Sequence, residues 1–200
     1  MAGGSRWANI GRRARAVEAR RSASKQPRER GGRVHARFEG YGPGGAAVLI
    51  ECMTDDPSGL GIAVRRAFAE HGGRIGARGS VSYLFNSVGL MAYPPGSDGR
   101  RLTRAAFAAG AEDVVTNDDT SVEVLTDPLD FKTVASRLSE QALAPVVAEI
   151  TWRAASAVEL SGEAAAEMLR LLAALEALGT GCEVYSNADI AAEETSQPKS

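Results

Sequence analysis

The residues best placed to do chemistry in this chain are a cluster of glycines. Residues 40–45, Gly-Tyr-Gly-Pro-Gly-Gly, satisfy the G-x-G-x-x-G spacing with which a nucleotide-binding loop holds a pyrophosphate. That chemistry requires a helix directly after the glycines, so that its N-terminal N–H groups meet the phosphate. Here residues 46–52 follow as an apolar run of strand length. We therefore interpret the glycines as tight turns before a strand, with Pro43 fixing φ and glycines adopting positive φ, and predict no cofactor.

The histidines and acidic doublets do not combine into a catalytic pattern. His35 and His71 have no serine or cysteine nearby that could serve as a nucleophile. The doublets at 55–56 and 118–119 could bind a metal or share acid and base roles, but aspartates at turns also cap helices and turns. The sequence therefore predicts a protein that is not an enzyme and binds no metal.

The two cysteines, Cys52 and Cys182, are far apart, form no CxxC pattern and lie beside apolar residues. We predict buried, reduced thiols rather than a disulfide or a zinc site. No apolar run approaches the roughly 20 residues that a membrane helix needs. The N-terminus also lacks the apolar core of a secretory signal, so the expected location is the cytoplasm and no membrane partner is expected.

Positive charge is concentrated at the N-terminus. Residues 1–37 carry 11 Lys and Arg and two acidic residues, a net charge of +9, whereas residues 38–200 carry 12 basic and 23 acidic residues, a net charge of -11. A basic arm on an acidic body indicates contact with a polyanion, and a solvated tail is the alternative.

Apolar residues in the arm recur at helical spacing and predict a helix over 6–21 that begins after Ser5. A single helix of this length is marginal in water, so it needs a partner. Trp7 either holds this helix to the rest of the protein or stacks on an unpaired base. The candidate nucleic-acid contacts are Arg6, Trp7, Arg12, Arg13, Arg15, Arg20 and Arg21.

The remaining elements predict an α+β protein. After the strand at 46–52 we expect a helix at 59–70 and two short β segments within 80–94, broken near Asn86. The next elements follow the β-α-β-β-α-β order of a ferredoxin-like domain: strand 88–93, helix 100–109, strands 112–116 and 121–125, helix 130–141 and strand 145–152. A helix at 163–178 and a strand at 182–185 then complete the first piece, which makes the ferredoxin-like unit an insertion.

The domain boundaries follow from this order. Residues 1–37 are predicted to be a basic helix and a linker (22–37) without periodicity. Residues 38–87 and 158–192 form one α+β domain, 88–157 the inserted ferredoxin-like domain, and 193–200 a flexible polar tail.

Several blocks of the sequence resemble the YebC/PmpR family, which includes the mitochondrial translational activator of cytochrome c oxidase. They are MAGGSRWANI at the start, EGYGPGGAAVLIECMTD at 39–55, GSVSYLF at 79–85, AGAEDVV at 109–115 and the closing LLAALEAL and CEVYSNADI. The resemblance implies a YebC-like fold: a helical N-terminal domain, and a ferredoxin-like domain inserted into a second small α+β domain. The chain departs from the family pattern in its short helical segment, in Gly11 where a lysine is usual, and at residues 56–61.

The resemblance implies a probable transcriptional regulator that binds DNA, here through the basic N-terminal segment. The alternatives are a ribosome-associated translation factor that binds RNA and a protein-only adaptor that has lost nucleic-acid binding. Phosphate contacts from the arm would serve either polymer, and no helix-turn-helix is visible in the sequence. For Tyr41, Gly42, Pro43 and Gly44, a contact loop and a purely structural turn both remain open.

Overall fold

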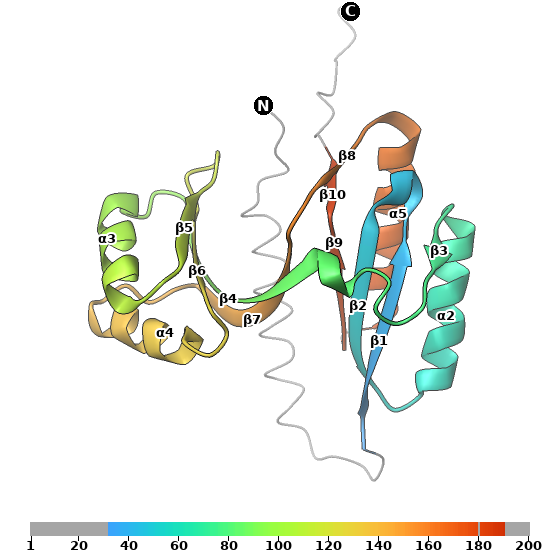
Figure 1. Cartoon of the computed structure of the whole chain (residues 1–200), viewed down its shortest axis with the longest axis horizontal. Coiled ribbons are helices and arrows are strands. Elements are labelled where there is room, and N and C mark those ends of the chain that lie inside the picture. Colours follow the sequence, from blue (N-terminus) through green and yellow to red (C-terminus); the bar gives the residue numbers. More distant parts are fainter. Residues whose placement is uncertain (1–31, 180, 191–200) are drawn as a thin grey trace, which may run out of the picture. The chain divides into compact units, whose positions relative to one another are not determined.

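The computed structural model describes residues 32–179 and 181–190. These residues form two compact units (Figure 1). The inserted unit comprises Ser87–Arg153, and the split unit comprises residues 32–86 and 154–190. The predicted helix at 6–21 and tail at 193–200 lie outside the described residues.

The split unit is built on a four-stranded sheet with the order β3-β1-β2-β9. Strand β1 (Val34–Tyr41) pairs antiparallel with β2 (Ala47–Thr54) along the full length of both strands. The short β3 (Arg74–Ile75) and β9 (Cys182–Ser186) flank them, each antiparallel to its neighbour. A separate parallel pair joins β8 (Val158–Leu160) to β10 (Ala188–Ile190).

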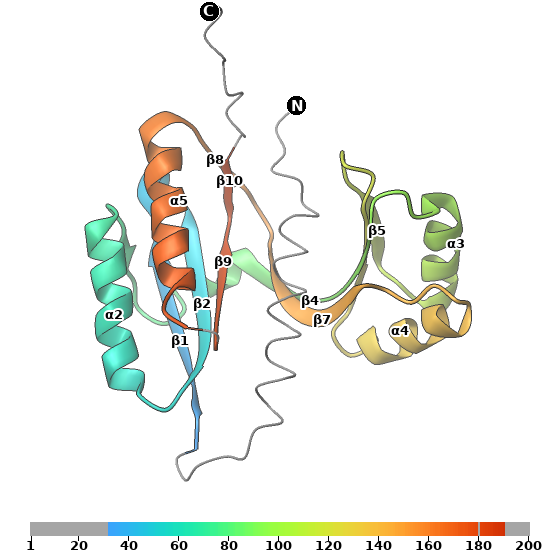
Figure 2. The ribbon, with the colours of Figure 1, turned by 180° about the vertical axis from the view of Figure 1, so that it is seen from behind.

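Two helices, α2 (Pro57–Glu70) and α5 (Gly162–Glu176), pack on the same face of this sheet (Figures 1 and 2). Alternate residues of β2 point into the core, because successive side chains of a strand face opposite sides. The helices contribute apolar residues three and four apart, which gives each one an inward face. The largest fully buried members of this core are Val48, Ile50, Val64, Phe68, Met168, Leu171 and Leu175.

The inserted unit has the predicted ferredoxin-like topology. Its elements are β4 (Phe85–Tyr93), α3 (Gly99–Ala109), β5 (Asp113–Thr116), β6 (Val122–Thr126), α4 (Phe131–Glu140) and β7 (Val147–Ala154). The sheet order is β5-β6-β4-β7, so the first and third strands of the unit lie in the centre. Its core joins side chains of the sheet to both helices and includes Met91, Leu102, Val122, Val124, Val134 and Leu138.

Two element predictions were wrong. Strand β1 begins at Val34, inside the segment predicted to be a linker, because its eight residues pair with β2 over the whole register. The segment 80–94 contains one strand, β4, and not two. Asn86 is exposed within β4 and does not interrupt it, and a short 3₁₀ turn (Ser82–Leu84) precedes the strand.

The prediction of reduced thiols was also wrong. Cys52 of β2 and Cys182 of β9 form a disulfide, although 130 residues separate them in the sequence. The antiparallel register of β2 and β9 places the two residues directly opposite each other. Sequence spacing gave no sign of this pairing, because it depends on which strands become neighbours. Over the described residues, no helix is long and apolar enough to cross a bilayer.

Candidate nucleic-acid interface

The basic side chains predicted to contact nucleic acid, Arg6, Arg12, Arg13, Arg15, Arg20 and Arg21, lie outside the described residues, and so does Trp7. The other predicted contact residues, Tyr41–Gly44, span the last residue of β1 and the connection that leads to β2. This connection is therefore the part of the predicted interface that has a described geometry.

The glycines of this connection form a tight turn, in agreement with the turn interpretation. Pro43–Gly45 form a 3₁₀ turn, and Gly44 and Gly45 have φ of 67° and 78°. Gly42 donates to the carbonyl oxygen of Ala46 over 2.8 Å, and Gly45 donates to that of Gly42 over 3.1 Å. No helix begins after the glycines, since β2 follows at Ala47. The turn therefore has no helix N-terminus to offer a phosphate.

The turn packs directly on the core of the split unit. Gly42 and Pro43 are buried, and a Cβ atom on Gly42 would lie 2.5 Å from Sδ of Met168. Tyr41 is half-buried and Gly44 is exposed. A contact role for this segment stays a prediction, and in this conformation it can involve only Tyr41 and the exposed part of Gly44.

Substituting Gly44 with alanine tests how much the turn contributes to stability. We expect Gly44→Ala to lower the free energy of unfolding by about 2 kcal/mol, because the new Cβ would clash with Cδ2 of buried Leu160 and the residue would stay in a left-handed conformation. Gly45→Ala is the matched control: its φ is also positive, but nothing lies within 4 Å of its Cβ position. It should lose about 1 kcal/mol from backbone strain alone. Urea unfolding of both variants measures the difference, and equal losses would contradict a packing role for Gly44.

A buried carboxylate links the motif at 39–45 to the loop that precedes β4. Glu39 is 2% exposed. Its Oε1 accepts from the N–H of Gly79 at 2.9 Å, and its Oε2 accepts from those of Val81 at 2.8 Å and Ser82 at 2.9 Å. The carbonyl oxygen of Glu39 also accepts from the N–H of Gly76 at 2.7 Å. One residue of β1 thus holds the loop 76–82 through four backbone donors.

The ionised form of Glu39 is favoured in this environment. Burial by itself would raise the pKa of Glu39, but the bonds from Val81, Gly79 and Ser82 and the charge of Arg37 act in the opposite direction. The result is a pKa lowered from its usual value of 4.5. Glu39 is therefore a charged residue that anchors the loop through hydrogen bonds. Its lowered pKa is the opposite of the raised pKa expected of a buried general acid.

Two tyrosines and two arginines lie on this loop and on the elements that flank it. The Tyr41 hydroxyl donates to the carbonyl oxygen of Ser80 at 2.7 Å, and the guanidinium carbon of Arg74 lies 5.3 Å from the centre of the Tyr41 ring. Desolvation, and then hydrogen bonding to Tyr83, raises the pKa of Tyr41. Tyr83 is 70% exposed, and Arg78 is an exposed residue of the same loop. We refer to Tyr41, Arg74, Arg78 and Tyr83 as the Tyr–Arg cluster.

Sequence reasoning did not find this cluster. The signal available was the stretch RIGARGSVSYLF at 74–85, which has two arginines after a predicted helix and one tyrosine within the first β segment predicted in 80–94. Two positive charges do not stand out in a body of net charge -11, and the exposure of Tyr83 depends on how Glu39 holds the loop.

Three of the polar residues weighed for catalysis, Asp56, His71 and Asp119, have local structural partners. Asp56 accepts from the N–H of Gly59 at 2.9 Å and caps α2, and Asp119 accepts from that of Ser121 at 3.0 Å. His71 lies 3.5 Å from a carboxylate oxygen of Glu167. In residues 32–179 and 181–190, no three His, Cys, Asp or Glu side chains gather closely enough to hold a metal ion.

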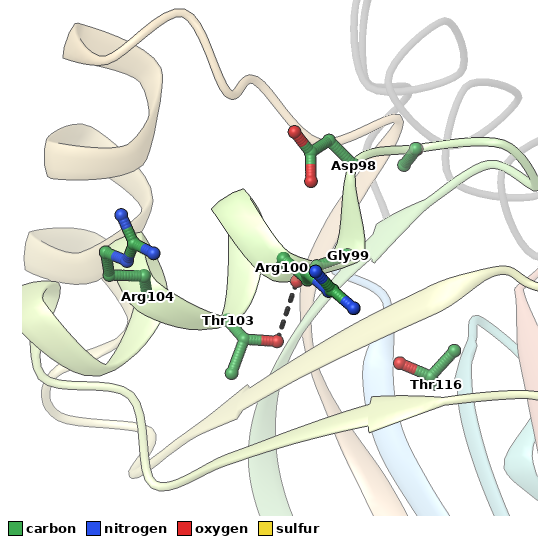
Figure 3. A pocket seen from close by; sticks show the side chains of 7 residues that line it. Asp98, Gly99, Arg100, Thr103, Arg104 and Thr116 are labelled. Atoms are coloured by element: carbon green, nitrogen blue, oxygen red, sulfur yellow. Dashed lines mark hydrogen bonds between the residues drawn. The ribbon is translucent and has the colours of Figure 1, made fainter.

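A shallow depression lies at the N-terminus of α3 in the inserted unit (Figure 3). Asp98 accepts from the N–H of Arg101 at 3.0 Å and caps the helix, and Thr103 donates to the carbonyl oxygen of Gly99 at 2.7 Å. Arg100 and Arg104 extend from α3 in different directions in Figure 3. Asp98 and Thr103 are therefore both engaged in hydrogen bonds with the backbone of α3, and the two arginines do not converge on one point. This is not the geometry of a catalytic site, in which polar groups converge on a reacting atom.

The chain is similar to proteins of one family. The family model described as "TACO1/YebC second and third domain" matches residues 34–188. A "probable transcriptional regulatory protein" of Paraburkholderia xenovorans is 48% identical over 157 residues, which are 78% of this chain and 65% of that protein. A protein of the same description from Halorhodospira halophila is 43% identical over 157 residues, 78% of this chain and 64% of that protein. The match thus spans just under two thirds of the length of these relatives.

A solved structure supports the same assignment. The crystal structure of the conserved hypothetical protein Aq1575 from Aquifex aeolicus has a TM-score of 0.75 to this chain, with 33% sequence identity. The similarity covers 86% of this chain and 70% of that one. It confirms the α+β fold with an inserted ferredoxin-like domain. The chain therefore belongs to the TACO1/YebC family, and the match to the second and third domains of that family covers residues 34–188.

Proposed function

We propose that this protein regulates transcription in the cytoplasm, without catalysis, by binding DNA through its basic N-terminal segment. Its relatives are named probable transcriptional regulatory proteins. The observation that carries the proposal is the charge distribution: residues 1–37 hold 11 Lys and Arg and two acidic residues in a chain of net charge -2. Such a segment neutralises phosphates and releases their counterions, which drives binding to any nucleic acid.

Binding to RNA in a translational role is the second candidate. Each of the four described helices, α2 to α5, is separated from the next by at least one strand, so the described part of the chain contains no helix-turn-helix. Reading of bases in a DNA major groove by such a motif therefore has no support in residues 32–179 and 181–190. The exposed ring of Tyr83, next to a loop that carries the exposed Arg78, is also more typical of contact with unpaired bases.

The basic segment is tested by replacing the six arginines predicted to contact nucleic acid, at 6, 12, 13, 15, 20 and 21, with glutamine in the full chain. We measure binding to a duplex DNA and to a structured ribosomal RNA fragment by fluorescence anisotropy across a salt series. For the unchanged protein we expect a log–log salt slope of about -4 or steeper, and for the variant a clearly shallower slope, since each phosphate contact contributes about -0.9 on a duplex. The polymer bound more tightly then distinguishes a transcriptional role from a translational one.

The control variant replaces three exposed arginines of the described units, Arg65, Arg100 and Arg104, with glutamine. It should retain most of the affinity and the salt slope of the unchanged protein. If the control variant loses as much affinity and salt dependence as the six-arginine variant, the N-terminal segment has no special role in binding. If the unchanged protein binds neither polymer, nucleic-acid binding is wrong for this chain and the protein-only adaptor replaces it.

A further inference from the structure

The Tyr–Arg cluster combines an exposed aromatic ring with positive charge. Tyr83 is 70% exposed, and Arg74 and Arg78 are both exposed. Within residues 32–179 and 181–190, neither guanidinium has a carboxylate close enough to form a salt bridge, whereas Arg37, Arg66, Arg153 and Arg170 each do. The charge of Arg74 and Arg78 is therefore available to a ligand.

The loop that carries the cluster is held in place by the fold. Four backbone N–H groups of residues 76–82 donate to Glu39, and Tyr41 donates to the carbonyl oxygen of Ser80. The ring of Tyr41 also lies under Arg74 at 5.3 Å, which restricts the guanidinium. A ligand that binds here does not have to order the loop first, and less affinity is lost to conformational entropy.

We propose that the Tyr–Arg cluster binds unpaired bases of RNA, with one base stacked on the ring of Tyr83 and adjacent phosphates contacted by Arg74 and Arg78. Every base has a π face that a tyrosine ring can stack on, and guanidinium groups contact phosphate oxygens. In a duplex the bases are already stacked on each other, whereas RNA loops and bulges present unstacked bases. This site uses no residue of the basic N-terminal segment; it rests on the second candidate function proposed above, RNA binding, and assigns the residues of the described chain that carry it.

The test uses the full chain and a labelled 12-nucleotide oligouridylate, with binding followed by fluorescence anisotropy. We expect Tyr83→Ala to weaken binding by about 5- to 100-fold, the usual loss for one stacked base. Tyr83→Phe should remain within about twofold, because the phenyl ring still stacks. Arg74→Gln and Arg78→Gln should each make the log–log salt slope shallower by about 0.7, the contribution of one single-strand phosphate.

Phe107→Ala is the matched control, since Phe107 is also an exposed aromatic residue (50%) but lies on α3 of the inserted unit. It should leave the affinity unchanged, and thermal unfolding should show that Tyr83→Ala remains folded. An unlabelled ribosomal RNA fragment should displace the probe from the unchanged protein at a concentration at which a duplex DNA of equal length does not.

Repeating these measurements with the six-arginine variant as the parent separates the two sites. If that variant no longer binds duplex DNA, but adding Tyr83→Ala to it still weakens binding of the oligouridylate, the cluster functions independently of the N-terminal segment. An unchanged affinity for Tyr83→Ala would overturn the proposal, as would a Tyr83→Phe variant as weak as Tyr83→Ala. Displacement of the probe by duplex DNA as effective as that by RNA would overturn the assignment to unpaired bases.

Discussion

Glu39→Gln is expected to lower the free energy of unfolding by about 2–4 kcal/mol. The substitution keeps the size of the side chain but removes its charge and one of its two acceptor oxygens. Glu39 accepts three backbone N–H groups within the split unit and is 2% exposed, so at least one donor loses its partner and meets the new NH₂ group. A hydrogen bond to a charged group contributes about 1.5–3 kcal/mol, and leaving a buried donor unsatisfied costs about 1–3 kcal/mol.

The matched control is Glu159→Gln, the same chemical change at an exposed strand position of the split unit. It should change the stability by less than about 0.5 kcal/mol. Urea unfolding at pH 7, followed by far-UV circular dichroism, measures both variants. If Glu39→Gln is no less stable than Glu159→Gln, the loop 76–82 does not depend on the carboxylate.

The same carboxylate makes stability depend on pH in a defined direction. The pKa of Glu39 in the folded protein lies below the usual value of 4.5, so the unfolded state binds the proton more readily. The stabilisation is therefore fully present above about pH 5 and is lost as the pH falls through the folded-state pKa. Unfolding midpoints measured from pH 7 down to pH 3 should fall more steeply for the unchanged protein than for Glu39→Gln. Parallel curves for the two proteins would contradict this role of Glu39.

Glu39 also gives a physical reason why two separate sequence blocks occur together. EGYGPGG at 39–45 supplies the carboxylate and the tyrosine. GSVSYLF at 79–85 supplies the backbone N–H groups that donate to the carboxylate, and the carbonyl oxygen that accepts from the tyrosine hydroxyl. The two blocks are one structural unit that holds a loop on β1. In this arrangement the loop exposes Tyr83, so the family motif and the proposed RNA site share one scaffold.

The sequence was sufficient to predict those helices and strands whose own residues show a clear apolar pattern and clear ends. The inserted unit was predicted in the right order because each helix has an apolar face and each strand is bounded by turn residues, as at Gly110 and Asn117–Asp119. Strand β1 carried a weaker signal, because Pro27 and the glycines at 31–32 precede it and its alternation is short. Its partner β2 stabilises it, and that pairing is not visible in a local window of sequence.

The candidate site could be predicted only where composition marks it. Eleven basic residues among the first 37 stand out in a composition count, and on that basis the N-terminal segment was predicted to contact nucleic acid. The Tyr–Arg cluster depends on four residues spread over positions 41–83 that a buried carboxylate brings together. Buried Glu39 itself looked like one more charge of an acidic body, since the sequence does not show which donors surround it.

The disulfide carries the second large expected effect. Reduction of the Cys52–Cys182 bond should lower the free energy of unfolding by about 2–5 kcal/mol. The bond joins β9 to β2 across 130 residues, a span that includes the entire inserted unit, so it removes much of the freedom of the unfolded chain. It also fixes β9, which is one of the two edge strands of the sheet β3-β1-β2-β9.

Thermal unfolding with and without a thiol reductant measures this contribution. The midpoint of the unchanged protein should fall by about 5 °C or more in reductant, since 1 kcal/mol corresponds to about 2–4 °C in a chain of this size. A double variant, Cys52→Ala and Cys182→Ala, should unfold at a low midpoint in both conditions. Alanine suits these positions because Cys52 is 1% exposed, and alanine adds no polar group that would need a hydrogen-bond partner there. Alkylation of both cysteines in denatured, unreduced protein would show that the bond does not form, and the midpoint would then be insensitive to reductant.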